Sequence, residues 1–231
     1  MNVANAEIAA DLAPSGTLRA AINLGNPVLA QGTADAPRGV TVDIARELAS
    51  RLGLPLELVC FDGARASFEA MAGGQADICF LAVEPAREGT VAFTEPYVVI
   101  EGVFAVPEGS AIISLADVDR EGVRISVNTG AAYDLFLTRT LRHATLVRSE
   151  NGVATFLDEA ADVAAGIRQP MTELVESYPG LRLLDGSFME IRQALGTTRA
   201  RSAETVQFLR AFIEELKAGG FIAAALSATD S

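Results

Sequence analysis

The fold is decided by residues 77–100, which read DICFLAVEPAREGTVAFTEPYVVI. The stretch opens with six consecutive apolar residues, 78–83, bounded by turn signals, and such a run predicts a strand buried on both faces. Glu84 and Arg87 follow, which puts a guanidinium just past the strand's carboxyl end, where open α/β sheets bind their ligands. Arginine presents a planar fork of donors that suits a carboxylate or phosphate. Arg87 is therefore a candidate ligand-binding residue, and the alternative is a solvated surface arginine.

The residues after this strand resemble the signature of a known family. An arginine six residues before Phe93, followed by Thr94 and then by Pro96-Tyr97, resembles the signature of family 3 extracellular solute-binding proteins, the polar amino-acid receptors of ABC importers. In that family the arginine binds the α-carboxylate of the ligand, so the resemblance gives this role to Arg87. The segment before Arg87 is shorter than in the family, and apolar residues including Phe80 replace its hydroxyl-rich run. The resemblance covers residues 17–226.

Composition limits the classes of partner. The chain has 231 residues and a net charge of −12 with no cluster of Lys or Arg, which argues against nucleic acid as a partner. It has no apolar run near the ~20 residues of a membrane span, so we expect a protein that does not span the membrane. We expect a monomer without a cofactor or a metal site. Cys60 and Cys79 are compatible with one disulfide, but buried free thiols are the favoured interpretation.

The start of the chain shows no export signal. Residues 1–16, MNVANAEIAADLAPSG, lack both a basic start and an apolar core, and we expect a loose tail. The resemblance implies an exported, periplasmic protein, in which case the signal has already been removed and Met1 was added. A cytoplasmic protein is the alternative.

Short apolar strands alternate with helices from Thr17 onward, which predicts βαβ units and parallel sheets. The strands of the first half are expected at 18–23, 56–61 and 77–83, and its helices at 43–52 and 65–72. The second half repeats the alternation, with strands expected at 123–127, 145–147, 162–167 and 181–184 and helices at 131–141, 154–159 and 171–177. Ser202 is expected to cap a long helix that ends at Gly219-Gly220, and a short final helix follows at 221–226.

Two extended segments, at about 97–106 and 188–196, bracket the middle of the chain. We expect them to cross between two lobes, the first made of residues 1–105 and 195–231 and the second of residues 106–194. The fold class is then α/β, a two-lobed fold like that of type II periplasmic binding proteins. Each lobe is expected to be a mostly parallel sheet flanked by helices. A cleft between hinged lobes is where a small ligand is expected to bind.

Polar residues follow the carboxyl ends of four predicted strands, two in each lobe. In the first lobe the candidates are Phe80, Glu84 and Arg87 on one strand and its loop, and Asn23 and Asn26 after another. In the second lobe they are Asn128, Thr129, Gly130 and Tyr133 after one strand, and Arg168 and Gln169 in the loop after another. We expect free backbone amides at 128–130 to hold an anion.

Some of these residues also have purely structural interpretations. Phe80 and Tyr133 are equally compatible with ordinary core aromatics, and Asn26 before Pro27 suits a turn.

The family's two anionic partners for a ligand amino group are missing here. Asn23 falls where the family often has an aspartate, and Ile167 falls where it has the carboxylate that holds the α-ammonium. Glu84 or Asp134 could substitute, but with Arg87 and Arg168 both expected near the cleft, an organic acid without an amino group is a serious contender.

The leading hypothesis is a binding protein that captures a small carboxylate or amino acid and delivers it to an ABC permease. The chain has no GxxxxGK[ST] loop, so the transporter's ATPase would supply the energy. The alternative is a periplasmic dehydratase of the cyclohexadienyl dehydratase type, which shares this fold, with Glu84, Glu101 or Glu190 as general acid. A sensor that presents ligand to another protein is a third class. No residue is assigned a catalytic role under the leading hypothesis.

Overall fold

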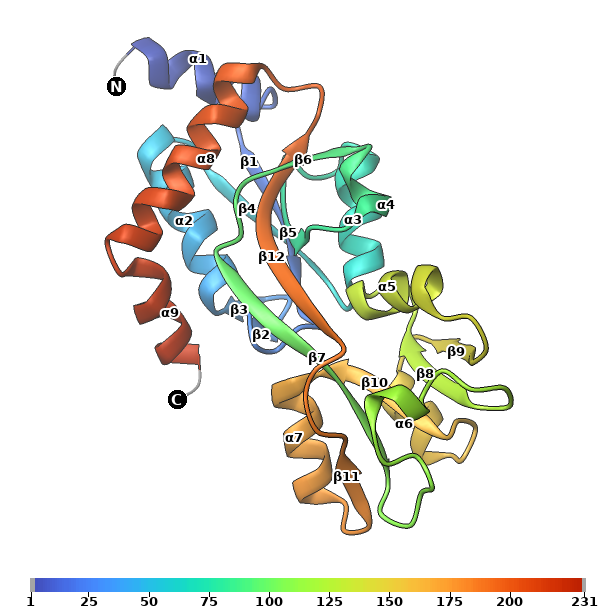
Figure 1. Cartoon of the computed structure of the whole chain (residues 1–231). Helices are drawn as coiled ribbons and strands as arrows, with labels where there is room; N and C mark the ends of the chain where they lie inside the picture. Colours follow the sequence, from blue (N-terminus) through green and yellow to red (C-terminus); the bar gives the residue numbers. More distant parts are fainter. Residues whose placement is uncertain (1–2, 230–231) are drawn as a thin grey trace. The chain divides into compact units, whose positions relative to one another are not determined.

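The computed structural model describes residues 3–229, which form two compact units (Figure 1). Unit 1 comprises Met1–Val98 and Arg192–Ser231, and unit 2 comprises Val99–Ile191. The long strands β7 (Val98–Pro107) and β12 (Met189–Thr198) run through the two boundaries. The α/β class predicted from the alternation of strands and helices is confirmed.

The sheet of unit 1 is parallel at its centre. Its strands are β1 (Leu18–Asn23), β4 (Leu56–Phe61), β5 (Ile78–Ala82), β6 (Val91–Phe93) and the carboxyl-terminal part of β12. β1 lies between β4 and β5 and is parallel to both, whereas β12 is antiparallel to β5 and carries β6 on its other side. A two-stranded hairpin, β2 (Gln31–Thr33) and β3 (Ala36–Arg38), stands apart from this sheet and was not predicted.

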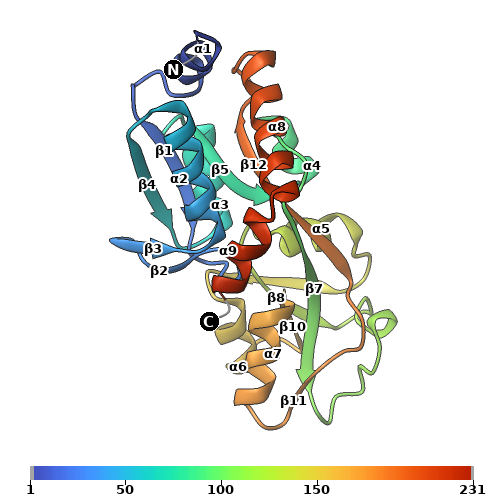
Figure 2. The same cartoon turned by 90° about the vertical axis from the view of Figure 1, so that its left-hand side faces the viewer.

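Helices cover both sides of this sheet. They are α1 (Val3–Leu12), α2 (Val40–Leu52), α3 (Ala64–Ala72), α4 (Pro85–Glu88), α8 (Ala203–Ala218) and α9 (Phe221–Thr229). Figure 1 shows α2 and α8 on one side of the strands and α3 on the other, and Figure 2 shows α2 in front of β1 and β4. β5 is buried over its whole length, as its continuous apolar run predicts.

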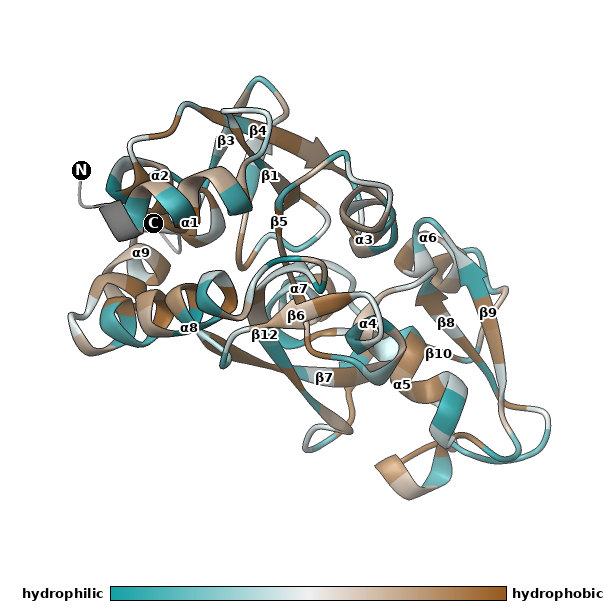
Figure 3. Ribbon diagram, turned by 90° about the horizontal axis from the view of Figure 1, so that it is seen from above, coloured by the Kyte–Doolittle hydropathy of each residue, from teal (hydrophilic) through white to brown (hydrophobic). Residues whose placement is uncertain are grey.

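The helix ends of unit 1 follow from local sequence. Gly53 adopts a left-handed conformation that ends α2, and the Ser202 side chain accepts from the Thr205 amide at the start of α8. Both ends were predicted. Asp43 was expected to cap α2, but the helix begins three residues earlier, after Gly39, because Val40 and Val42 extend its buried face. The apolar and polar bands of α8 can be followed in Figure 3.

Residues 1–16 were expected to form a loose tail, and for the described part this was wrong. Residues 3–12 form α1, which packs against α2 and α8, and Leu12 is fully buried. The Asp11 carboxylate accepts from the Ser202 amide at 2.9 Å, which ties α1 to the start of α8. Alanine is the commonest residue of α1, and the helix has no distinct apolar face. The spacing of apolar residues in the sequence therefore could not predict that α1 packs against the rest of unit 1. The expectation that Met1 was added lies outside the described residues.

Unit 2 repeats the plan of unit 1. Its strands are β7, β8 (Arg124–Asn128), β9 (Thr145–Ser149), β10 (Val163–Ile167) and β11 (Leu181–Leu183), and its helices are η1 (Leu115–Asp117), α5 (Ala132–Thr140), α6 (Gly152–Leu157) and α7 (Arg168–Ser177). β8 lies between β9 and β10 and is parallel to both, and β7 is antiparallel to β10. The order β9-β8-β10-β7 thus corresponds to β4-β1-β5-β12 of unit 1.

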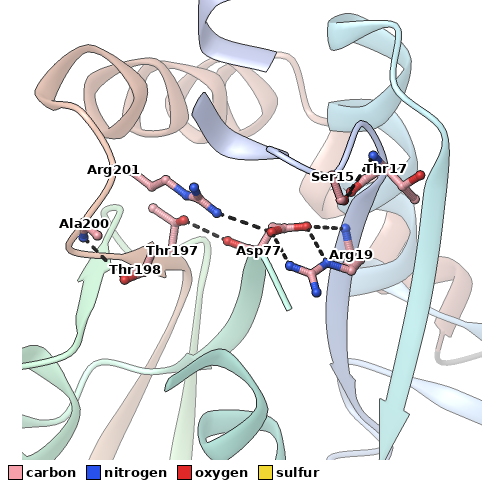
Figure 4. A network of polar contacts seen from close by, with 8 residues as sticks. All are labelled: Ser15, Thr17, Arg19, Asp77, Thr197, Thr198, Ala200 and Arg201. Carbon is pink, nitrogen blue, oxygen red and sulfur yellow. Dashed lines mark hydrogen bonds and ion pairs between the residues drawn. The ribbon is translucent and has the colours of Figure 1, made fainter. Parts of the chain in front are cut away.

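In each unit an arginine on one central strand donates three hydrogen bonds to an aspartate just before the other, an arrangement that we call the Arg–Asp lock. Asp77, just before β5, accepts from the Arg19 amide at 2.9 Å and from its Nε and Nη2 at 3.0 and 2.8 Å (Figure 4). Asp162, just before β10, accepts from the same three atoms of Arg124 at 2.9, 3.1 and 3.0 Å. The Asp77 lock is the deeper one, because its side chain is fully buried and also accepts from Arg201 at 3.3 Å.

The two locks predict different costs for the same substitution. Asp77→Ala should lower the free energy of unfolding by about 3 kcal/mol or more, since it leaves two guanidinium groups without a buried counterion. Asp162→Ala should cost only about 1 kcal/mol, because that pair is half exposed. Urea unfolding followed by circular dichroism measures both. Equal costs would show that burial does not set the strength of the lock.

Candidate ligand-binding site

The candidates of unit 1 gather at the carboxyl ends of two neighbouring parallel strands. β1 pairs with β5 through Ala20 opposite Ile78 and Ala21 opposite Cys79, so the register places Asn23 level with Leu81. The loops that leave β1 and β5 therefore start at the same edge of the sheet.

Arg87 lies in the one-turn helix α4, where a loop was expected. Pro85 occupies the first helical position, where its missing N–H costs no hydrogen bond. The Arg87 side chain is only 2% exposed, and its Nη1 donates to the Ala82 carbonyl at 3.1 Å. Burial lowers the pKa of Arg87, but a guanidinium stays charged in proteins. The chain thus holds a desolvated positive charge at the end of its most buried strand, and the alternative of a solvated surface arginine is wrong.

Glu84 and Phe80 are also buried, at 3% and 1% exposure. Glu84 is the N-cap residue of α4, three positions before Arg87 in the sequence. The Phe80 ring meets the Tyr97 ring edge to face, with centroids 6.2 Å apart. Tyr97 was not among the predicted site residues, yet its hydroxyl is buried without a hydrogen-bond partner among the described residues. Burial also raises the pKa of Tyr97. Its place in the Pro-Tyr signature was the signal that could have identified it.

The two asparagines after β1 differ in what they hold. Asn23 Oδ1 accepts from the Gly25 amide at 3.0 Å, so this side chain shapes the turn. Asn26 is 3% exposed, and its Oδ1 has no hydrogen-bond partner among residues 3–229. Its main-chain carbonyl accepts from Leu29 and Ala30 at 3.0 Å, as expected for a turn residue. Asn26 therefore combines the turn role with a buried acceptor that is still open.

In unit 2, two of the amides expected to hold an anion, those of Thr129 and Gly130, already have acceptors, and so does the next amide along the chain. Thr129 donates to the Ser149 carbonyl at 2.9 Å, Gly130 to Asp134 Oδ2 at 2.8 Å and Ala131 to the Asn128 carbonyl at 3.1 Å. An anion could use these amides only by displacing a bond of the protein. Asn128 Oδ1 accepts from the Gly152 amide at 2.7 Å, which links the end of β8 to the start of α6.

Asp134 is committed to the fold of unit 2. It is 3% exposed, accepts from Arg148 Nε at 2.9 Å and also receives a hydrogen bond from Thr138. Its neighbour Tyr133 is 6% exposed, and burial raises the pKa of its phenol. Asp134 is therefore a poor substitute for the missing partner of a ligand ammonium group.

Arg168 and Gln169 lie in the first turn of α7 rather than in a loop. The helix was expected to begin after Pro170, but proline is tolerated in a first turn, so the helix includes it. Arg168 pairs with Glu101 and donates to the Gly186 carbonyl at 2.8 Å. This guanidinium is already matched by an anion of its own unit.

Both cysteines are free, with Cys79 fully buried and Cys60 half-buried. Burial raises the pKa of Cys79 to about 12, which keeps it a neutral thiol near neutral pH. Across residues 3–229, no three His, Cys, Asp or Glu side chains are grouped in a way that could hold a metal ion. None of the helices in that range has the length and apolar character needed to cross a bilayer.

Comparison with known proteins gives a match over nearly the whole chain. The sequence profile of the "Bacterial extracellular solute-binding proteins, family 3" matches residues 18–227. No curated protein sequence gives a significant match.

Among solved structures, the fold is similar to that of a mutant of ArgBP from T. maritima (TM-score 0.77, 20% identity, 98% of each chain covered). It is also similar to AbpA of Streptococcus pneumoniae, an amino acid ABC transporter substrate-binding protein bound to L-arginine (TM-score 0.78, 18% identity, 94% of this chain and 96% of that one). A third similar structure is AncCDT-1, described as an ancestral amino-acid-binding protein and precursor of cyclohexadienyl dehydratase (TM-score 0.76, 18% identity, 94% and 96% covered).

Substitution by alanine should affect two glycines differently, Gly25 in the turn after β1 and Gly63 after β4. A Cβ at Gly25 would lie 2.3 Å from the Asp62 carbonyl, whereas a Cβ at Gly63 would meet nothing within 4 Å. Gly25→Ala should therefore cost about 1–3 kcal/mol through overpacking. Gly63→Ala should cost only about 0.5–1 kcal/mol, because Gly63 is the N-cap of α3, where glycine is preferred to alanine. Differential scanning calorimetry checks the difference. Similar melting temperatures for the two variants would mean that the turn is not tightly packed.

Proposed function

Because the chain belongs to the bacterial extracellular solute-binding proteins of family 3, we propose that it captures a small carboxylate-bearing solute and delivers it to an ABC permease. In this proposal the protein works as a monomer in the periplasm. The solute is an amino acid or a related organic acid.

The observation that carries the proposal is the burial of Arg87. A guanidinium with 2% exposure at the carboxyl edge of a parallel sheet has lost most of its hydration. A carboxylate placed on its donor fork forms charge-assisted hydrogen bonds, which are strongest where the local dielectric is low. Arg87 is therefore proposed to bind the acid group of the ligand.

A second residue of unit 1 supports a polar ligand at this edge. The open acceptor Oδ1 of Asn26 is buried and suits an N–H or O–H donor of a ligand. Phe80 and Tyr97 contribute an apolar and aromatic surround that excludes water. The proposed site thus pairs one fixed cation with one open acceptor.

The contribution of unit 2 stays a prediction. Asn128, Thr129, Tyr133 and Gln169 are proposed to contact the ligand through their side chains. Gly130 is proposed to contact it through its main chain, where the amide already donates to Asp134. Arg168 is proposed to contribute only if the ligand's acid group competes with Glu101 for it.

The bound solutes of the relatives suggest where to begin. AbpA, one of the similar structures, is bound to L-arginine, and ArgBP is another protein with a similar fold. L-arginine and other amino acids therefore come first among the compounds to test. Two carboxylates were considered as partners for a ligand amino group, Asp134 and Glu84. Asp134 forms an ion pair with Arg148, whereas Glu84 immediately precedes the helix α4 that contains Arg87. The choice between an amino acid and a simple organic acid is thereby proposed to depend on Glu84.

A dehydratase is the second candidate, favoured by the similarity to AncCDT-1. The carboxyl of Glu84, Glu101 or Glu190 is the proposed general acid, and Glu84 is the one buried next to the α4 turn that carries Arg87. Incubation with prephenate or arogenate, followed by detection of the aromatic product, distinguishes an enzyme from a binding protein.

Removal of the Arg87 guanidinium should abolish ligand binding. In a thermal-shift screen of L-amino acids and small mono- and dicarboxylates, a compound at 100 times its dissociation constant should stabilise the wild type by about 2.7 kcal/mol. Arg87→Ala should show no such shift. Arg87→Lys should show a weaker one, because lysine keeps the charge but loses the fork.

Arg46→Ala is the matched control, because Arg46 is a largely exposed arginine of the same unit. This variant should respond as the wild type does. A full ligand shift in folded Arg87→Ala protein would refute the assignment of Arg87.

Glu84→Gln should report the class of the ligand. If the ligand carries an amino group, loss of this carboxylate should weaken binding roughly tenfold or more, the cost of a lost charge-assisted hydrogen bond. If the ligand is an organic acid without an amino group, affinity should be retained or increased. Isothermal titration calorimetry with the compound found in the screen measures the difference. Loss of affinity for a ligand without an amino group would rule out this role for Glu84.

A further inference from the structure

Unit 1 contains a polar pocket whose lining residues lie outside the proposed site. Its volume is about 290 Å³, and it is lined by β6, by the turn after it and by residues of α4, β12 and α8. Arg192, Arg199 and Arg210 contribute three guanidinium groups, and Glu88 and Glu95 contribute two carboxylates. The lining includes neither Arg87 nor Glu84 nor Asn26.

Two of these arginines are fixed by main-chain carbonyls. Arg199 Nε donates to the Glu88 carbonyl, and Arg210 Nε donates to the Phe93 carbonyl at 3.3 Å. The Arg199 amide also donates to the Thr90 carbonyl at 3.1 Å, which holds its backbone against the start of β6. A guanidinium tied through Nε has a restricted orientation and keeps its two Nη groups for another acceptor.

No carboxylate in the part of the chain described here pairs with Arg199 or Arg210. This is unusual in a chain with a net charge of −12, in which acidic side chains outnumber basic ones by 30 to 18. Glu88 and Glu95 line the same pocket without forming such a pair.

We propose that this pocket binds a small oxyanion, a phosphate or carboxylate group, between the Nη groups of Arg199 and Arg210. The planar forks of two fixed arginines match the oxygens of such a group. The pocket is large enough for a small anion. Its lining does not include Arg87, although Glu88, the next residue of α4, supplies the carbonyl that holds Arg199.

The pocket contains both arginines and glutamates, so the test removes positive charge in one variant and negative charge in another. Thermal stability of the whole protein is measured against sodium phosphate, with sodium chloride at matched ionic strength as the reference. We expect a saturable stabilisation of the wild type that chloride does not reproduce. The double variant Arg199→Gln/Arg210→Gln should bind phosphate at least about tenfold more weakly, and Glu88→Gln/Glu95→Gln should bind it more tightly.

Two further variants separate this proposal from other effects. Arg87→Ala should keep the phosphate response even though it loses the proposed solute, so failure of one proposal does not affect the other. Arg46→Gln, which removes an arginine elsewhere in unit 1, should also keep it. If the wild type responds to phosphate no more than to chloride, or the double arginine variant keeps the full response, the pocket is not an oxyanion site. Should the arginine variant not fold, unchanged binding in Glu88→Gln/Glu95→Gln overturns the proposal equally.

Discussion

The position of Arg87 depends on how firmly the start of β5 is held. Asp77 anchors that start to β1 through three hydrogen bonds from Arg19 and to the segment before α8 through Arg201. Its main-chain carbonyl also accepts from Thr197 on β12 at 2.8 Å (Figure 4). With both neighbours of β5 locked in register, its carboxyl end is fixed, and Pro85 then starts the single helical turn that carries Arg87.

Unit 2 uses the same construction with a different outcome. Arg124 and Asp162 repeat the lock between the two central strands. Yet the charges at its strand ends are paired within the unit, Asp134 with Arg148 and Arg168 with Glu101. The two units therefore share a scaffold, and the proposed acid-group contact comes from unit 1.

Much of the fold could be predicted because its strands are continuous apolar runs. The bounds of β1 and β4 agree with the predicted ranges, and β5 differs by one residue at either end. Helix α1 was missed because an alanine-rich segment shows no face, and the β2–β3 hairpin was missed because its strands have only three residues each.

The site could be predicted only in part, for a different physical reason. The position of Arg87 follows from local sequence, since it lies a few residues beyond a buried strand. The roles of Asn128 and Asp134 depend on Gly152 and Arg148, which lie 24 and 14 residues further along the chain. The Arg199 and Arg210 pocket likewise joins β12, α8 and β6, so no short motif could indicate it.

The central claim is that the Arg87 guanidinium binds the acid group of a solute. The most direct measurement is a crystal structure of the protein with the compound that native mass spectrometry finds bound after purification, or with the strongest compound of the thermal-shift screen. We predict a carboxylate of that compound on the Nη and Nε groups of Arg87, at hydrogen-bond distances of about 2.7–2.9 Å. A ligand whose acid group lies elsewhere, with Arg87 making only contacts to its own chain, would contradict the account.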